Sequence, residues 1–373
     1  MNRKLASIQR ITKLSPIDGA DKIEVADILG WKVVVAKSDN FKVGDLVVYC
    51  EIDSILPDKP EFEFLRERKF KIKTIKLRGQ VGQGICFNLD SIPEMKQQFA
   101  KGIGYYWDEG DDVTDIIGVK KYDPLAEWEK KEFEKRQLIH KNRINKFFSK
   151  YKWYRNLLFK PERIPFPSFI KKTDEDRIQL FPNICEEYKG FDFQYTEKLD
   201  GTSATYFITK NKLFSKLFKP YIFCVCSRNY QLIKNDNSVY WKIAKQLKEK
   251  LTWLIKQVDA DYVVLQGEII GVGIQGNKYN LKEIDFYLFN VFYDDEQLDN
   301  ELLSNVAEII EVKTVPILGE ITIKNTIQDM VNFSVGQSAI NSKTKREGLV
   351  FRNYGKGLSF KVINPDFLLQ YDE

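Results

Sequence analysis

The stretch YTEKLDGTS at residues 195–203 carries most of the information about the fold and chemistry of this chain. Strand-like residues precede Lys198 and follow Gly201, and Asp200-Gly201 is typical of a tight turn between two strands. Such a turn leaves a lysine amine at a strand end, with a carboxylate two residues further along. A plain hairpin turn needs no function, so this stretch alone leaves a structural and a chemical interpretation open.

Four further motifs place charged residues at or beside the ends of other expected strands. They are SRN at 227–229, GE at 267–268, EGLVFR at 347–352 and SFK at 359–361. Together with the first motif they supply, in chain order, Lys198, Arg228, Glu268, Glu347 and Lys361. This is the inventory that a protein needs to bind ATP and to form a lysine phosphoramidate.

The chemistry explains why these residue types are needed. A lysine attacks phosphorus only as the neutral amine, so its pKa has to lie below its usual value of about 10. A second cation, Lys361, and a divalent cation near the α-phosphate would favour deprotonation and neutralise the transition state. Asp200, Glu268 and Glu347 are the carboxylates available to hold Mg²⁺ or Mn²⁺, directly or through waters. For Asp200, an Asx turn is an alternative.

Two further candidates, Arg228 and Phe289, also have structural alternatives. Arg228 offers a planar fork for a phosphate or a ribose edge, but a surface salt bridge would also explain it. Phe289 could stack on adenine, but apolar residues flank it at 286–292, so a core aromatic is the alternative.

In this order the motifs resemble those of the covalent nucleotidyltransferases, which comprise the ATP-dependent ligases and the mRNA capping enzymes. The resemblance spans residues 170–373 and implies that Lys198 is the catalytic nucleophile, that Phe289 stacks on the base and that Lys361 contacts the α-phosphate. The nucleotide-binding set that it implies is Glu197, Lys198, Arg228, Glu268, Phe289, Glu347 and Lys361. Many RNA ligases have a K-x-K pair in the last motif, whereas Ser359 and Ile363 flank Lys361 here. A second cation, if one is needed, would come from elsewhere, such as Lys343, Lys345 or Lys356.

Residues 1–118 are predicted to form a separate β-rich unit. Strands are expected at 5–11, 24–28, 31–36, 45–51, 70–77 and 84–88, with turn residues between them. Several short strands in little over a hundred residues favour a β-barrel of the OB type. The order of the domains, with a barrel before the catalytic part, resembles that of the Deinococcus-type nick-sealing RNA ligases. The stretches KTDEDRIQ at 172–179 and IQGN at 274–277 are also similar to sequences in those ligases.

This first unit contains a basic segment that is a candidate RNA contact. On a strand over 70–77, Lys69, Lys71 and Lys73 would share one face, while Phe70 and Ile72 face the core. A solvated sheet face is the alternative, but we favour contact with phosphates. The candidate nucleic-acid-binding residues are Arg66, Lys69, Lys71, Lys73 and Arg78.

The remaining chain divides into a linker and a catalytic domain. Residues 119–168 are expected to be a basic, aromatic-rich helical linker, whose segment 141–163 either packs between domains or contacts nucleic acid. Residues 169–373 are predicted to be α+β, with helices at 239–257, 302–310 and 327–333 between strands. Strands are expected at 191–197, 203–209, 222–227, 262–270, 286–292, 348–352 and 358–362. The resemblance implies that this domain is an antiparallel-sheet nucleotidyltransferase (ATP-grasp-like ligase) domain.

Composition narrows the classes of function. The five cysteines are odd in number and form no CxxC pair, so buried free thiols are expected rather than zinc ligands or disulfides. A single histidine makes histidine-based catalysis improbable. The net charge of +5 permits a polyanionic partner without requiring one. No apolar run is long enough to span a membrane and no secretory signal is visible, so we expect an intracellular, soluble monomer without a membrane partner.

These observations predict an ATP-dependent RNA ligase that uses Mg²⁺ or Mn²⁺. It would join 3′-OH and 5′-phosphate ends through a lysyl-AMP intermediate and an adenylylated 5′ end. The resemblance further implies that it seals nicks in duplexes whose 3′-OH strand is RNA. The alternatives are a DNA ligase or capping-type nucleotidyltransferase, and a non-catalytic nucleic-acid-binding scaffold.

Overall fold

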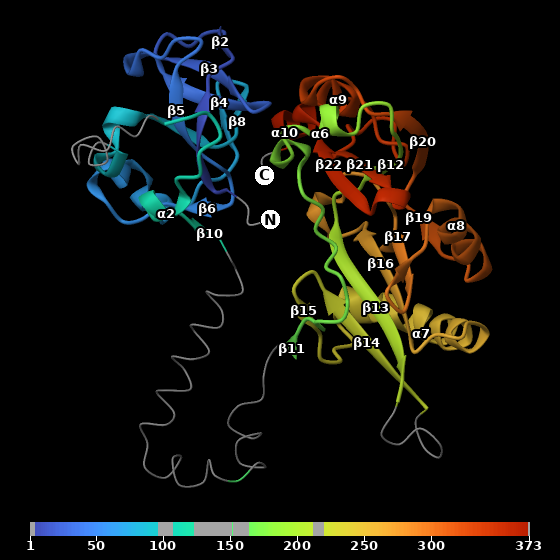
Figure 1. Ribbon diagram of the computed structural model, residues 1–373. Coiled ribbons are helices and arrows are strands. Elements are labelled where there is room, and N and C mark those ends of the chain that lie inside the picture. Colours follow the sequence, from blue (N-terminus) through green and yellow to red (C-terminus); the bar gives the residue numbers. More distant parts are fainter. Residues whose placement is uncertain (1–3, 96–106, 123–150, 152–163, 212–219, 372–373) are drawn as a thin grey trace.

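The computed structural model describes residues 4–95, 107–122, 151, 164–211 and 220–371 (Figure 1). The long strands pair antiparallel, and several helices lie against them. The predicted α+β class with antiparallel sheets is therefore confirmed. Most of segment 119–168, including nearly all of the basic aromatic stretch at 141–163, lies outside the described residues.

The first part of the chain folds around one apolar core. One antiparallel sheet has the order β1 (Ala6–Arg10), β5 (Leu46–Cys50), β9 (Ile85–Asn88), and a second has β2 (Lys13–Pro16), β3 (Ile23–Ile28), β4 (Trp31–Ala36). Two short ribbons join β6 (Ser54–Ile55) with β10 (Lys120–Lys121) and β7 (Ile75–Leu77) with β8 (Gln80–Gly82). Trp31, Tyr49 and Phe62 are completely buried in the common core. The sheets thus wrap a single interior, as expected of a small barrel.

The strand predicted at 70–77 is wrong in its first half. The 3-10 helix η2 (Pro60–Arg68) ends at Lys69, and both Lys69 and Phe70 have left-handed backbone angles, with φ of 53° and 59°. Phe70 and Ile72 are nevertheless buried in the apolar core, and their backbone N–H groups donate to the Leu65 and Ser54 carbonyls. The alternation of charged and apolar residues is therefore accommodated by a turn and an isolated bridge between Lys71 and Ile55, and only β7 is a strand.

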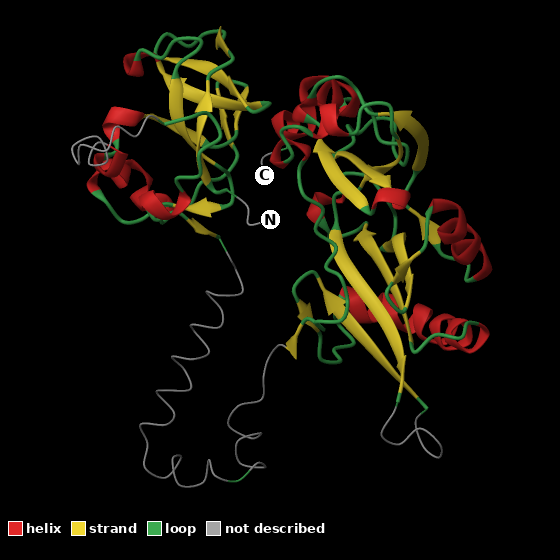
Figure 2. Ribbon diagram, in the orientation of Figure 1, coloured by secondary structure: helices red, strands yellow, loops and turns green. Residues whose placement is uncertain are grey.

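The second part of the chain contains two sheets. The larger has the order β11 (Ile164–Pro165), β15 (Tyr230–Gln231), β14 (Tyr221–Ser227), β13 (Thr202–Lys210), β16 (Tyr262–Ile270), β17 (Asp285–Tyr293), β18 (Glu296–Gln297), with β19 (Lys313–Thr314) beside β17. Helices α7 (Val239–Gln257) and α8 (Asn300–Ile309) bury their apolar sides against it (Figure 2). The helix predicted at 239–257 has these bounds in the structure.

The smaller sheet has four strands. Their order is β20 (Ile317–Thr322), β12 (Asp192–Lys198), β21 (Gly348–Asn353), β22 (Leu358–Ile363). Helices α6 (Ile184–Glu187) and α9 (Ile327–Ser334) cover a core in which Phe193, Phe351 and Phe360 are completely buried. The sequence did not predict β20, because most of its side chains are exposed and show no clear apolar alternation.

The stretch at 195–203 does not form the plain hairpin that was its structural alternative. Strand β12 pairs with β20 and β21, whereas β13 pairs with β14 and β16, so the turn between them connects the two sheets. Hairpin strands would pair with each other, but here β12 pairs with strands more than a hundred residues further along the chain, and β13 pairs with β14 and β16 of the other sheet. The turn after Lys198 therefore lies where the two sheets meet.

The first part of the chain lies beside the smaller sheet (Figure 1). Val81 in β8 packs with Ile363 and with Leu368 of the last helix, α10 (Pro365–Gln370). Lys76 donates a hydrogen bond to the Leu369 carbonyl, and the guanidinium of Arg177 lies 5.7 Å from the ring centre of Trp31. These contacts bring the barrel next to the strands that carry the final motifs.

All five cysteines are free in the structure. Four are buried and Cys224 is half-buried, which confirms the expectation of thiols in apolar surroundings. None of the helices in the described ranges is both long and apolar enough to cross a membrane.

Candidate functional site

Lys198 is the last residue of β12, and a short turn leads from it into β13. Gly201 closes this turn against β16, where an added Cβ would lie 2.4 Å from the Ile269 carbonyl oxygen. Any larger residue would therefore displace one strand from the other. The glycine of this motif is needed for close approach of the chain segments.

The glycines beside the two motif glutamates serve the same purpose. A Cβ on Gly267 would lie 2.4 Å from the Tyr287 carbonyl oxygen, and one on Gly348 would lie 2.3 Å from that of Val362. Each glycine is thus packed against the backbone of a neighbouring strand. Their neighbours Glu268 and Glu347 are held at the same junction as Lys198, because Glu268 pairs with Ser203 and Gly348 with Lys198 in the sheet registers.

Three carboxylates surround the amine of Lys198. Its Nζ lies 2.5 Å from Oε1 of Glu347, whose side chain is 9% exposed. Burial alone would lower the pKa of Lys198, but Glu347, Glu268 and Asp200 outweigh burial and raise it. The surrounding carboxylates therefore favour the ammonium form of Lys198, which is the opposite of the direction that attack on phosphorus requires.

Two further glutamates near Lys198, Glu268 and Glu197, differ in their surroundings. Burial raises the pKa of Glu268 to about 8, although Lys198 opposes the shift. Glu197 is 1% exposed, and its carboxylate accepts a hydrogen bond of 2.7 Å from the Ala339 N–H. Because side chains alternate along a strand, Glu197 lies on the opposite side of β12 from Lys198.

Asp200 forms an ion pair with Lys278, a residue that the sequence did not single out. Both side chains are largely buried, with 9% and 13% exposed. The N–H of Asp200 donates to the Tyr279 hydroxyl at 2.7 Å, and the Lys278 amine lies 4.9 Å from the ring centre of Phe367. The pairing partner was missed because it is 78 residues away, in a loop without regular structure.

A second charged group joins Arg228 and Lys361. One carboxylate oxygen of Asp174 contacts the Arg228 guanidinium, and the other lies 3.1 Å from Nζ of Lys361. These two cations outweigh the effect of burial and lower the pKa of Asp174 to about 2. Asp174 lies within the 172–179 stretch, but it was not among the predicted site residues.

The open question of a second cation near Lys361 has a partial answer. Two of the three lysines considered have other contacts, because Lys345 pairs with Asp366 at 3.0 Å and Lys356 lies over the Phe191 ring. Burial lowers the pKa of Lys361, and the nearby charges of Lys198 and Arg177 lower it further. Arg177 and Arg228 are thus the arginines near this lysine.

Phe289 occupies a β-bulge in β17. The register passes from the pair Gln266–Asn290 to the pair Gly267–Leu288, which leaves Phe289 without a partner opposite it. Its ring is half-buried against the cluster that contains Leu199 and Tyr287. A bulge redirects a side chain relative to its neighbours, so Phe289 is partly packed and partly accessible.

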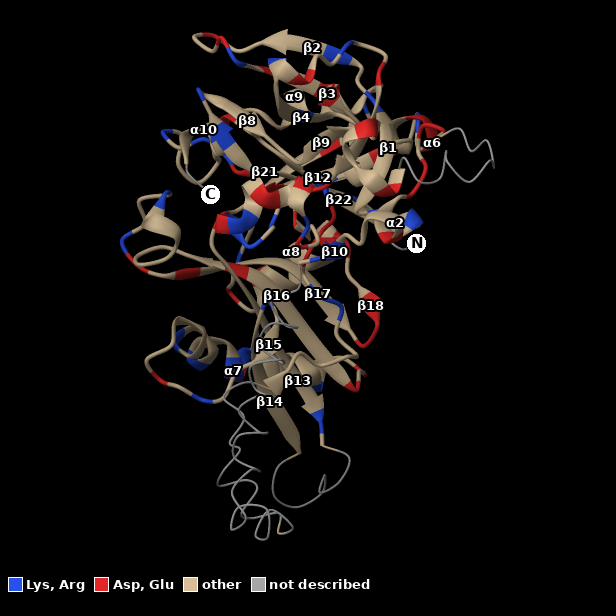
Figure 3. Cartoon of the chain, turned by 90° about the vertical axis from the view of Figure 1, so that its left-hand side faces the viewer, with Lys and Arg blue, Asp and Glu red and all other residues tan. Residues whose placement is uncertain are grey.

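The predicted nucleic-acid-binding residues do not form one strand face. Arg66 is in η2, where it pairs with Asp58 at 2.7 Å and Glu63 at 2.6 Å. The Lys71 amine lies 3.8 Å from the ring centre of Tyr122, and Lys69 and Lys73 are exposed. Arg78 is exposed in the turn between β7 and β8. Figure 3 shows basic segments near the labels of β8 and α10.

The carboxylates do not form a ready-made ligand cage. Within the described ranges, no three His, Cys, Asp or Glu side chains gather closely enough to hold a metal ion directly. Lysine amines lie against two of the three predicted ligands, since Lys198 contacts Glu347 and Lys278 contacts Asp200. Oxygen ligands of this kind still fit Mg²⁺ or Mn²⁺ held through waters.

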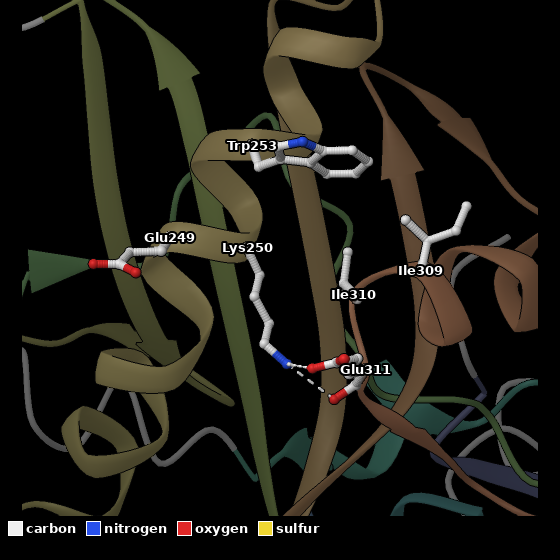
Figure 4. A pocket seen from close by; sticks show the side chains of 6 residues that line it. All are labelled: Glu249, Lys250, Trp253, Ile309, Ile310 and Glu311. Atoms are coloured by element: carbon white, nitrogen blue, oxygen red, sulfur yellow. Dashed lines mark hydrogen bonds and ion pairs between the residues drawn. The ribbon is translucent and has the colours of Figure 1, made fainter.

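A shallow pocket elsewhere contains none of the predicted site residues. It lies between α7 and the end of α8 and is lined by Glu249, Lys250, Trp253, Ile309, Ile310 and Glu311 (Figure 4). The Lys250 amine donates to the Glu311 carbonyl at 3.0 Å, so the pocket contains an internal pair rather than a catalytic group.

Comparison with known proteins supports the assignment of the fold and shows the family. A family model described as RNA ligase matches residues 191–363, and one described as an OB-fold domain matches residues 5–89. No curated protein matches the chain. Among solved structures, two variants of Naegleria gruberi RNA ligase determined with ATP and Mn each have a TM-score of 0.70. One variant is 31% identical, with 99% of both chains covered, and the other is 30% identical, with 100% of both chains covered. The same ligase with PPi has 32% identity, a TM-score of 0.70 and 99% coverage of both chains.

The antiparallel sheets, the barrel and the motif lysine between the sheets thus define a nucleotidyltransferase fold with an N-terminal OB-fold domain. The chain belongs to the RNA ligase family. The predictions of an OB-type barrel and of an RNA ligase are confirmed.

The raised pKa of Glu268 predicts how the stability of the metal-free protein depends on pH. A carboxyl group whose pKa is about 8 in the folded protein, above its unfolded value, holds its proton more tightly when folded. Its contribution to stability is complete below the unfolded pKa of about 4.3 and is lost as the pH rises through about 8. In EDTA, we expect the Tm of the wild type to fall more steeply from about pH 5 to about pH 8 than that of Glu268→Gln.

Thermal melts over this pH range measure the effect, and Glu296→Gln is the matched control because its side chain is exposed at β18. Parallel curves for all three proteins would show that Glu268 is ionised throughout and would contradict the burial argument.

Proposed function

We propose that this RNA ligase uses ATP and Mg²⁺ or Mn²⁺ to adenylylate Lys198, and passes the AMP to a 5′-phosphate end. The observation that carries the proposal is the position of the Lys198 amine at the junction of two sheets, 2.5 Å from Glu347 and near Glu268 and Asp200. The Naegleria gruberi ligase structures determined with ATP and Mn, and with AMP and Mn, support the choice of nucleotide and metal.

In the first step, Nζ of Lys198 attacks the α-phosphorus of ATP, a P–N bond forms, and the bond to pyrophosphate breaks. The proton on Nζ has to leave before the attack, and we assign Oε1 of Glu347 as the acceptor because it already lies 2.5 Å away. Lys361 and Arg228 are assigned to the phosphates, where they stabilise the growing negative charge. We assign Phe289 to the adenine face and Glu197 to the support of β12 behind Lys198.

Asp200, Glu268 and Glu347 would hold the divalent cation, in part through its waters. The cation supplies positive charge that polarises the phosphate and favours the neutral amine of Lys198. The carboxylates that now raise the pKa of Lys198 would then face the metal instead of the ammonium group. This exchange of partners explains how a raised pKa in the free protein is compatible with a nucleophilic lysine.

In the following steps, the 5′-phosphate of a broken strand attacks the lysyl-AMP, and a 3′-hydroxyl then displaces AMP to form the phosphodiester. We propose that the substrate is a nicked duplex with an RNA 3′-OH strand and that the enzyme acts as a monomer. Residues 1–118 would act as the OB domain, residues 119–168 as the linker and residues 169–373 as the catalytic domain. Exposed basic residues of the OB domain, among them Lys69, Lys73 and Arg78, are proposed to contact the RNA backbone.

The adduct tests the first step. After incubation with α-labelled ATP and Mn²⁺, we expect the wild type to carry label on a denaturing gel and Lys198→Ala to carry none, because only residue 198 supplies the nucleophile. Lys210→Ala is the matched control, since Lys210 is at the far end of β13 with a side chain 39% exposed. Label on Lys198→Ala would move the nucleophile elsewhere, and no label on any protein would favour the scaffold alternative.

The enzyme's preference for an RNA or a DNA 3′-OH terminus tests the later steps. Nicked duplexes that differ only in a ribose or deoxyribose at the 3′-OH terminus are offered to the pre-adenylylated enzyme. We expect sealing of the RNA terminus to be faster by about tenfold or more, because a site that hydrogen-bonds the 2′-hydroxyl rejects its absence strongly. Equal rates would remove the proposed preference while leaving lysyl-AMP formation intact.

A further inference from the structure

Asp174 lies between the two cations that are assigned to the phosphates of ATP. Its Oδ2 contacts the Arg228 guanidinium, and its Oδ1 lies 3.1 Å from Nζ of Lys361. The Asp174 side chain is 51% exposed, so solvent and ligands reach it, whereas that of Lys361 is only 17% exposed. One accessible carboxylate thus compensates two cations of the site.

The backbone around Asp174 is fixed independently of its carboxylate. The N–H of Lys361 donates to the Asp176 carbonyl at 2.8 Å, and Arg177 forms a β-bridge with Lys361. Glu175 forms an ion pair of 3.3 Å with Arg352, and the hydroxyls of Thr173 and Ser203 are 2.8 Å apart. The position of residue 174 therefore does not depend on its contacts with the cations.

The arrangement of charges resembles that around a bound phosphate. Two oxygens that share a negative charge face a guanidinium and an ammonium group, as two non-bridging phosphate oxygens would. ATP and Asp174 cannot both satisfy the same hydrogen-bond donors of Arg228 and Lys361. A phosphate that binds these cations has to displace the carboxylate.

We propose that Asp174 is an internal substitute for a phosphate group of ATP, which competes with the nucleotide and with pyrophosphate for Arg228 and Lys361. Asp174 thereby sets how tightly the enzyme binds ATP and how readily it releases pyrophosphate. The proposal rests on the proposed function, because it takes Arg228 and Lys361 as the cations that bind phosphate.

The variant Asp174→Asn tests the competition, because a neutral amide is a weaker ligand for both cations. We expect half-maximal formation of lysyl-AMP at an ATP concentration lower by about tenfold, which corresponds to about 1.4 kcal/mol. Asp176→Asn is the matched control, since it removes the same charge from an exposed side chain two residues along. An unchanged or raised ATP requirement in Asp174→Asn would overturn the proposal.

Calorimetric titration with pyrophosphate and Mg²⁺ provides a readout without covalent chemistry. Pyrophosphate should bind Asp174→Asn about tenfold more tightly than the wild type or Asp176→Asn, whereas adenosine, which has no phosphate, should not distinguish the three proteins. Equal or weaker binding of pyrophosphate by Asp174→Asn would overturn the competition. Absence of lysyl-AMP in the wild type would refute the proposed function instead, and the pyrophosphate titration would still report on Asp174.

Discussion

The ion pair between Lys198 and Glu347 is the interaction on which the arrangement of the site depends. In the register of β12 and β21, Lys198 lies opposite Gly348, so Glu347 comes directly before the residue that pairs with the lysine. A shift of one residue would turn the side chains of one strand to the other face. The motif glycines Gly201 and Gly348 maintain this geometry, because neighbouring backbones leave no space for a Cβ.

The charges of the site are compensated internally in two groups. In one, Asp200 has Lys278 as its own partner, and Lys198 lies among Glu347, Glu268 and Asp200. In the other, Asp174 lies between Arg228 and Lys361. Binding of a metal nucleotide would exchange these internal partners for external ones. Buried charges are costly unless they are paired, which explains why the site has such partners before any ligand arrives.

Much of the fold and site could be predicted from the sequence, because both depend on local patterns. The helix at 239–257 has a clear apolar stripe, and Lys198, Glu268 and Glu347 belong to short motifs beside strands. What was missed depends on partners that are distant in sequence. Lys278 shows no pattern of its own, and the 172–179 stretch does not indicate which cations Asp174 contacts. The strand expected at 70–77 has the right burial in the wrong backbone conformation. The junction of two sheets at 195–203 cannot be distinguished from a hairpin until the partners of each strand are known.

The measurement that tests the central claim most directly is mapping of the adduct by mass spectrometry. The wild type is incubated with ATP and Mn²⁺, digested, and searched for peptides that carry AMP. The account predicts a single modified residue, Lys198, linked through its amine. AMP on another lysine, for example Lys278 or Lys361, would contradict the assignment of the nucleophile and with it the role given to the junction of the two sheets.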